Sequence, residues 1–310
     1  MKPKILITGG AGYVGTSLVS QLLAQDYNVR VFDNLMYGGN QLLHFIEHKN
    51  FEFQKGDIRD IESVKKAVKD QDIIIHLAAI VGYPACRKNP ELAEQVNVLG
   101  TKNLIAATSN EQFILYASTG SNYGAVDDVC DENTPLNPLS LYGQTKTLAE
   151  AMLLERKNVI TYRFATAFGV SPRMRLDLLI NEFTHKAFTE GYIVVYEKNF
   201  KRTFIHVHDM GRAFIFGINH MDKMKNDVFN VGSDTMNYTK EEICNLLKSK
   251  IDLYIHYAEV GKDMDKRNYS VSHKKINNLG YQTTITINEG IDGLIEAFKI
   301  LNTNNQYSNV

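Results

Sequence analysis

A cluster of glycines between a short apolar run and a helical pattern constrains this chain more than any other feature. The run 4–8 leads into the cluster, where Gly10, Gly12 and Gly15 fit G-x-G-x-x-G, and Gly9, Gly12 and Gly15 fit the wider G-x-x-G-x-x-G spacing. In either register one glycine makes a tight turn, another lets a pyrophosphate approach the backbone, and the third lets helix and strand pack closely. The following helix offers unpaired N–H donors and its positive dipole end to phosphates. The opening therefore predicts a strand–turn–helix unit that binds a dinucleotide.

An acidic residue supports this interpretation. Asp33 ends the next apolar run, about 20 residues beyond the glycines, where a carboxylate accepts hydrogen bonds from ribose hydroxyls. It would repel the 2′-phosphate of NADP by about 4 kcal/mol at close range and an effective dielectric near 20. The stretch 34–37 has no Lys or Arg to offset this repulsion, and Arg30 is expected on the solvent edge of its strand. The sequence predicts NAD as the cofactor.

Composition excludes several other classes. The 310 residues carry 34 basic and 35 acidic side chains, so no excess of positive charge is present to bind a nucleic-acid backbone. Cys86, Cys130 and Cys244 show neither metal nor disulfide spacing, which favours a reduced cytoplasmic setting. The longest apolar run, around 73–81, is interrupted by His76 and is too short to span a bilayer. We expect a cytoplasmic protein without metal, nucleic-acid or membrane partners.

Strand-like and helical segments alternate over the first half. This alternation, with apolar runs typical of strands buried on both faces, predicts an α/β fold with a Rossmann-type doubly wound parallel sheet. The expected strands are 4–8, 28–33, 51–54, 72–78, 112–117 and 159–164. The expected helices are 13–26, 60–69, 89–108 and 140–156.

The second half is less regular. We expect helices at 176–189, 209–219 and 240–249, the last opened by the capping box Thr239–Glu242, and short strands at 193–196, 203–206 and 252–257. The division is therefore a dinucleotide-binding domain over 1–170 and, over 171–310, mainly a smaller α/β substrate-binding lobe interleaved with the sheet.

A tyrosine and a lysine one helical turn apart are the candidate catalytic pair. Tyr142 and Lys146 share a helix face, so hydroxyl and ammonium point the same way. A tyrosine with a pKa near 10 needs a drop of about three units, roughly 4 kcal/mol, to act as a base near pH 7. A nearby ammonium in a partly dry site supplies about that much. Such pairs also occur by chance on exposed helices, but the dinucleotide loop favours catalysis here.

Other candidates lie where strands end, because the carboxyl ends of the strands line the ligand crevice of such sheets. Ser118 and Thr119 follow the strand 112–117; they either hydrogen-bond a substrate hydroxyl beside Tyr142 or cap a turn. Asp57, with Ile58, either borders the adenine or caps a turn. The small residues of 77–79 either let a flat ligand pass or simply pack tightly.

Together these residues resemble the extended short-chain dehydrogenase/reductases that modify nucleotide sugars, over about 3–300. Further matching stretches are 97–103, 162–169, 202–209 and 229–232. The resemblance implies Tyr142 as base, Lys146 as holder of the nicotinamide ribose, and Thr119 as partner hydroxyl. It also implies that Arg202 and Arg267 clamp the sugar-nucleotide pyrophosphate, and suggests a homodimer through 89–108 and 140–156.

The resemblance gives two sets of ligands. The residues expected to bind NAD are Gly9, Gly12, Tyr13, Val14, Gly15, Asp33, Asn34, Asp57, Ile58, Leu77, Ala78, Ala79, Asn97, Tyr142 and Lys146. Those expected to bind a nucleotide-diphosphate sugar are Ser118, Thr119, Thr166, Arg173, Arg175, Arg202 and Arg267, although Arg173 and Arg175 could instead cap and solvate the following helix.

Departures from the family pattern bear on the substrate. Gly120-Ser121 stand where dehydratases carry Asp-Glu, the loop lacks the cysteine of GDP-fucose synthases, and Thr166 replaces the usual Asn of UDP-galactose-type 4-epimerases. The stretches 169–183 and 266–272 look most like a bacterial branch that includes the GDP-heptose 4-dehydrogenases of capsule biosynthesis. The sequence leaves open a 4-dehydrogenase, a 4-epimerase, a 4-keto-sugar reductase, or a dinucleotide sensor without turnover.

Three tempting side chains are given structural roles. His206 and His208 are assigned to strand packing and a helix N-terminal contact rather than to a metal, and His76 to the core. Cys86 either reaches the sugar or fills a small buried space.

Overall fold

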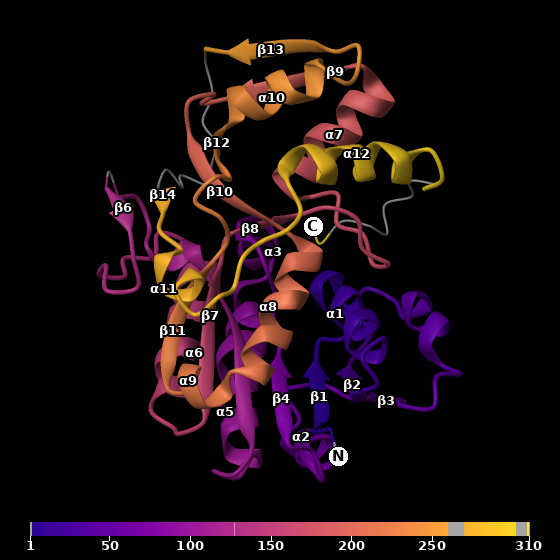
Figure 1. Cartoon of the computed structure of the whole chain (residues 1–310), viewed down its shortest axis with the longest axis vertical. Coiled ribbons are helices and arrows are strands. Elements are labelled where there is room, and N and C mark those ends of the chain that lie inside the picture. The colour runs from indigo at the N-terminus through magenta and orange to yellow at the C-terminus, as the bar shows by residue number, and fades with distance from the viewer. Residues whose placement is uncertain (1, 127, 260–269, 302–308, 310) are drawn as a thin grey trace.

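A parallel sheet forms the centre of the molecule (Figure 1). Within the residues that the computed structural model describes (2–126, 128–259, 270–301 and 309), this sheet has seven strands in the order β11-β7-β5-β4-β1-β2-β3. The strands are β1 (Lys4–Thr8), β2 (Asn28–Asp33), β3 (Phe51–Lys55), β4 (Ile73–His76), β5 (Phe113–Thr119), β7 (Val159–Phe164) and β11 (Asp227–Val231). The predicted Rossmann-type α/β fold is confirmed.

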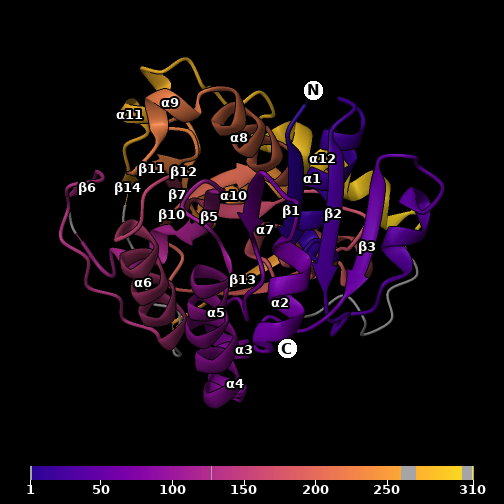
Figure 2. The ribbon, with the colours of Figure 1, turned by 90° about the horizontal axis from the view of Figure 1, so that it is seen from below.

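Helices cover both faces of the sheet, which explains its continuous apolar strands. On one face α1 (Tyr13–Leu23) packs beside α8 (Val207–Asn219). On the other, α5 (Gly100–Ala107) lies between α2 (Ile61–Val68) and α6 (Leu141–Leu154), as Figure 2 shows. The central strand β4 is 0–1% exposed over its four residues, because both layers cover it.

The segment predicted as one helix over 89–108 is interrupted. It consists of α4 (Pro90–Glu94), a π-helical turn (Gln95–Leu99) and α5, and it is preceded by an unpredicted short helix, α3 (Tyr83–Lys88). The π-turn inserts one extra residue per turn and so shifts which side chains face the sheet. Hydrophobic periodicity alone does not reveal such a shift.

The second lobe lies beyond the carboxyl ends of the strands (Figure 1). Its core combines α7 (Leu179–Glu190), α10 (Lys240–Lys248) and α12 (Ile287–Phe298) with two small sheets. The expected capping box at Thr239 is confirmed, and a second at Thr286 opens α12, which was not predicted. The lobe's strands are β8 (Thr166–Phe168), β10 (Lys201–His206) and β12 (Asn237–Thr239) in one sheet, and β9 (Tyr192–Tyr196) and β13 (Tyr254–Ala258) in the other.

Shorter elements connect these parts: α9 (Met221–Met224), α11 (Lys274–Asn277), the 3₁₀ turns Asn40–Phe45 and Gly120–Asn122, and the strand pair β6 (Val129–Cys130) and β14 (Ser270–Val271). The chain passes from β7 into the lobe, and β11 of the second half returns to the edge of the main sheet. The division at residue 170 stays a prediction. Among helices of the described residues, none has both the length and the apolarity needed to cross a bilayer.

A buried ion pair between Arg163 and Glu150 joins the strand β7 to the helix α6. Nη2 of Arg163 lies 2.6 Å from Oε1 of Glu150, and the two side chains are 6% and 3% exposed. Arg163 also donates to the hydroxyl of Tyr123 and the carbonyl of Glu132. Removing one partner of such a pair leaves an uncompensated buried charge.

Replacing Arg163 by methionine is expected to lower the free energy of unfolding by roughly 3–5 kcal/mol, because the Glu150 carboxylate loses its partner. Chemical denaturation followed by circular dichroism measures the change. Lys65→Met, at an exposed pair with Glu62, is the control and should cost at most about 1 kcal/mol. Equal losses in both variants would contradict the argument.

Candidate active site

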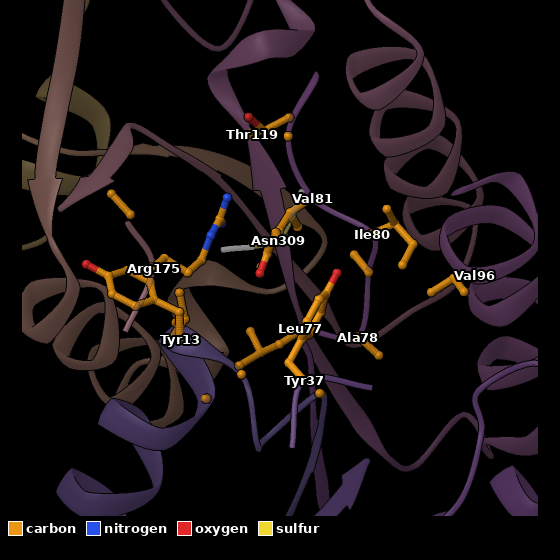
Figure 3. A pocket seen from close by; sticks show the side chains of 18 of the residues that line it. Tyr13, Tyr37, Leu77, Ala78, Ile80, Val81, Val96, Thr119, Arg175 and Asn309 are labelled. Carbon is orange, nitrogen blue, oxygen red and sulfur yellow. The ribbon is translucent and has the colours of Figure 1, made fainter. Parts of the chain in front are cut away.

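One pocket lies at the carboxyl ends of the central strands, between the sheet and the second lobe. Figure 3 shows Tyr13, Tyr37, Leu77 and Arg175 around it, with Thr119 farther along. The predicted residues that line it are Gly9, Gly12, Tyr13, Val14, Gly15, Asp33, Asn34, Asp57, Ile58, Leu77, Ala78, Ala79, Ser118, Thr119, Tyr142, Lys146, Thr166, Arg173 and Arg175. Residues far apart in sequence therefore share one cavity.

The glycine turn has the geometry that a phosphate needs. Gly9 has φ +73°, and a Cβ there would lie 2.7 Å from the backbone nitrogen of Ala78. A Cβ on Gly15 would lie 2.6 Å from the carbonyl oxygen of Gly9, so only glycine permits this packing. Gly12 is the N-cap of α1, and no side chain caps that helix. The first amides of α1 thus face the pocket with the positive end of the helix dipole, which fits the diphosphate of a dinucleotide.

Asp33 lines the pocket where β2 ends. Its Oδ2 accepts from the amide of Ala11 at 3.0 Å and its Oδ1 from the amide of Leu35 at 2.8 Å. Burial raises the pKa of this carboxyl, while these amides and the charge of Arg173 oppose the rise. Arg30 pairs with Glu52 and donates to the carbonyl of Ala67, and it is not among the pocket's lining residues.

Asp57 caps a turn at the pocket wall, and its place beside the adenine stays a prediction. Its Oδ1 accepts from the amide of Arg59 at 2.9 Å, which forms this cap. Hydrogen bonds from Arg59 lower the pKa of Asp57 to about 2. Its Oδ2 accepts from the side-chain amide of Asn34 at 3.1 Å.

Asn97 requires a correction. It was expected to bind the cofactor, but it lies behind the pocket wall and is 2% exposed. Its amide accepts from the backbone of Ile80 at 2.8 Å and donates to the carbonyl of Ile80 and to Thr145. Asn97 therefore holds the wall residue Ile80 and the helix α6 in place. Asn97 lies in the π-helical turn Gln95–Leu99, so its side chain faces these partners and not the pocket.

Tyr142 and Lys146 lie on the pocket side of α6. The hydroxyl of Ser140 accepts from the amide of Gly143 at 3.1 Å and so begins the helix just before the tyrosine. Lys146 is 3% exposed, and its Nζ lies 4.1 Å from the centre of the Tyr116 ring. Burial lowers the pKa of Lys146 to about 7, and the charge of Glu150, one turn further along, opposes this fall.

Thr119 and Ser118, the two hydroxyl residues at the end of β5, have different surroundings. Thr119 lines the pocket, and its Oγ1 also accepts from the amide of Ser121 at 3.2 Å, capping the following turn. Ser118 also lines the pocket, but its hydroxyl donates to Glu150 at 2.5 Å and accepts from Asn122. We therefore correct the expectation that the Ser118 hydroxyl binds substrate: it is engaged in the buried network.

Three of the five residues expected from the second half to bind substrate line the pocket. These are Thr166, Arg173 and Arg175, and Nη2 of Arg175 pairs with Asp177 at 2.6 Å. Arg202 is 7% exposed on β10 and is not among the residues that line this pocket, so its contact with the diphosphate of a sugar nucleotide stays a prediction. Arg267 lies outside the described residues.

The contacts of His76 and His206 agree with the structural roles predicted for them. His76 bonds Thr8 at 2.8 Å and Thr101 at 3.0 Å, and burial lowers its pKa to about 3. His206 caps α8 by accepting from the amide of His208. The thiol of Cys86 donates to the carbonyl of Ile80 and does not line the pocket; burial raises its pKa to about 11, which favours the filler role.

Sequence reasoning missed Glu150 and Tyr37. Glu150 follows Lys146 by four residues on the same helix face, so the spacing that identified the tyrosine and the lysine could have identified it. Tyr37 lines the pocket under the guanidinium of Arg173. Nothing local in the sequence indicates that contact, because 136 residues separate the two positions.

The fold, the glycine turn and Asp33 define a Rossmann-type dinucleotide-binding protein. The chain belongs to the NAD dependent epimerase/dehydratase family, whose family model matches residues 5–232. A putative UDP-glucose 4-epimerase of Methanocaldococcus jannaschii is 29% identical, over 95% of this chain and 98% of that protein. CDP-paratose 2-epimerase of Salmonella typhi is 26% identical, over 94% and 98%. Membership confirms that the protein is an enzyme that uses NAD, and the two relatives are named as epimerases of nucleotide sugars.

Solved structures agree with this membership. MoeE5 in complex with UDP-glucose and NAD is 25% identical, with a TM-score of 0.82 over 96% of this chain and 99% of that chain.

The low pKa of Lys146 makes stability depend on pH. Between about pH 7 and 10 the unfolded lysine is protonated and the folded one is largely neutral, so the unfolded state binds more protons and stability rises with pH. We expect Lys146 to contribute a slope of up to about 1.4 kcal/mol per pH unit in this window, and nothing below it. Chemical denaturation from pH 6 to 9.5, compared with Lys146→Met, measures it. Parallel profiles for both proteins would contradict the assignment.

Proposed function

We propose that the protein catalyses NAD-dependent oxidation at C4 of a nucleotide-diphosphate sugar. The observation that supports this most strongly is the shared pocket: Tyr142, Lys146 and Thr119 line the same cavity as the glycine turn and Asp33. A base and a dinucleotide site in one cavity are what removal of a proton and a hydride from one alcohol requires.

Tyr142 would act as the base that takes the proton from the C4 hydroxyl. NAD held at the glycine turn and Asp33 would supply the acceptor for the C4 hydride; the alcohol would become a ketone, its two electrons would leave with the hydride, and its hydroxyl proton would go to Tyr142. Thr119 shares the proton network through its hydroxyl. Lys146 would bind the nicotinamide ribose and, when protonated, stabilise the phenolate of Tyr142. Glu150 one turn away favours that protonated form.

Elimination of water is a poor fit to the same loop. Gly120 and Ser121 stand where dehydratases that resemble this chain carry an acid and a base. Ser121 lines the pocket but offers only a hydroxyl, and glycine offers no side chain. We therefore propose that the 4-keto sugar is not dehydrated.

The fate of the ketone separates two candidate functions. The stretch 169–183 favours release of the product by a 4-dehydrogenase, acting on a GDP-heptose in the synthesis of bacterial capsule polysaccharide. The relatives named as 4-epimerases favour return of the hydride to the other face of C4. A 4-dehydrogenase, a 4-epimerase and a 4-keto-sugar reductase would use the same groups around the reacting carbon.

The proposed substrate site lies beside the catalytic pair. Thr166 and Arg175 line the pocket from the second half, and Arg175 lies near enough to Tyr142 to influence it electrostatically. We also propose a homodimer through the helices of 90–107 and 141–154, where Leu99 and Leu148 are exposed.

The experiment incubates the purified protein with NAD and a panel of GDP-, UDP-, CDP- and dTDP-sugars. NADH absorbance reports net oxidation, and mass spectrometry with chromatography of the sugar reports a ketone or an epimer. We expect the wild-type protein to form either NADH with a ketone or an epimer from at least one of these sugars. Tyr142→Phe should lower that rate of turnover by at least about 100-fold, because a general base accelerates a reaction by roughly 10²–10⁴. Binding of NAD should be retained. Turnover unaffected by Tyr142→Phe, or NAD binding without turnover of any sugar nucleotide, would overturn the proposal and favour a sensor.

A further inference from the structure

Arg173 is a buried cation whose hydrogen bonds are incomplete. Its side chain is 3% exposed, and its Nε and Nη2 have no hydrogen-bond partner among the described residues. The guanidinium carbon lies 4.5 Å from the centre of the Tyr37 ring, which stabilises the charge but satisfies no N–H donor. A buried charged donor left unpaired is costly, so its presence in a ligand pocket indicates a missing acceptor.

The position of Arg173 identifies which ligand supplies that acceptor. The hydroxyl of Ser171, two residues earlier, donates to the carbonyl of Tyr13 at 2.6 Å and lies 3.1 Å from the hydroxyl of Thr16. The hydroxyl of Tyr13 donates in turn to the carbonyl of Gly169 at 2.7 Å. The segment 169–173 is thus fixed on the first turn of α1, the turn whose amides face the pocket.

The Tyr37 ring under Arg173 and the charge of Asp33 place the guanidinium toward the adenosine side. Arg173 influences Asp33 and Tyr37 electrostatically, and both lie at or just beyond the end of β2. It therefore lies between the N-terminus of α1, where phosphates bind, and the carboxylate that binds ribose. The nearby Arg175 differs, because Asp177 neutralises it, whereas no carboxylate of the described residues forms an ion pair with Arg173.

We propose that Arg173 binds the diphosphate of NAD, and not the diphosphate of the sugar nucleotide. This rests on the NAD site of the proposed function and changes the role expected for Arg173. The planar fork of a guanidinium matches two phosphate oxygens, and the diphosphate carries the negative charge that the site lacks. The segment after β8 thereby contributes a ligand to the cofactor, and the ring of Tyr37 packs against the guanidinium and holds it in place.

The test compares ligands with and without the diphosphate: ADP carries it, adenosine lacks it, and NAD adds the nicotinamide riboside to it. Isothermal titration of the full-length protein with NAD, ADP and adenosine compares wild type with Arg173→Met and Arg173→Lys. We expect Arg173→Met to weaken NAD and ADP by roughly 10- to 150-fold, the loss of a charge-assisted hydrogen bond, and adenosine by less than about 2-fold. Arg173→Lys should keep part of the affinity, because it retains the charge without the fork. Binding of UDP and GDP should be unchanged.

A matched control exists on α3, where Arg87 lies over the ring of Tyr83 at 5.9 Å but does not line the pocket. Arg87→Met should leave all affinities unchanged. Because Arg173 has unmet donors without a ligand, Arg173→Met should also not lower the melting temperature of the ligand-free protein.

Three results would overturn the proposal. One is an equal loss for adenosine and ADP; another is a loss for UDP or GDP instead of ADP. The third is a loss confined to 2′-phosphorylated ligands such as 2′,5′-ADP, which would assign Arg173 to a ribose phosphate. Wild-type protein that binds no NAD would instead contradict the proposed function itself.

Discussion

The contact between the β1–α1 turn and the end of β4 is the constraint on which the site depends. Gly9 lies so close to the backbone of Ala78 that no side chain fits between them, and Gly15 lies equally close to Gly9. This packing brings the uncapped end of α1 to the carboxyl edge of the sheet, where the other strands also end. The segment 169–171 is bonded to that helix end as well.

The second lobe is attached to the same helix end. Tyr13 is bonded to Gly169, and Ser171 to Tyr13, so the first turn of α1 holds the segment that carries Arg173 and Arg175. One helix terminus therefore positions both the cofactor region and the proposed substrate region. This coupling gives a physical reason why one lobe can supply ligands for both molecules.

Behind the catalytic face runs a chain of buried polar groups. Glu150 accepts from Ser118, Asn122 and Arg163, and its charge raises the pKa of Lys146 against the effect of burial. A lysine in so dry a place would otherwise lose its proton more readily. The network that stabilises the sheet–helix contact thus also sets the charge state of a group in the site.

The sequence by itself determined the parallel α/β fold, the glycine turn, Asp33 and the Tyr142–Lys146 pair, because each depends on local spacing or on strand periodicity. Only the tertiary structure decided that Asn97 supports the wall and that the Ser118 hydroxyl is engaged by Glu150. It also placed Tyr37 against Arg173. These contacts join distant segments, and their geometry follows from how helices and lobes pack, which no local pattern of residues encodes.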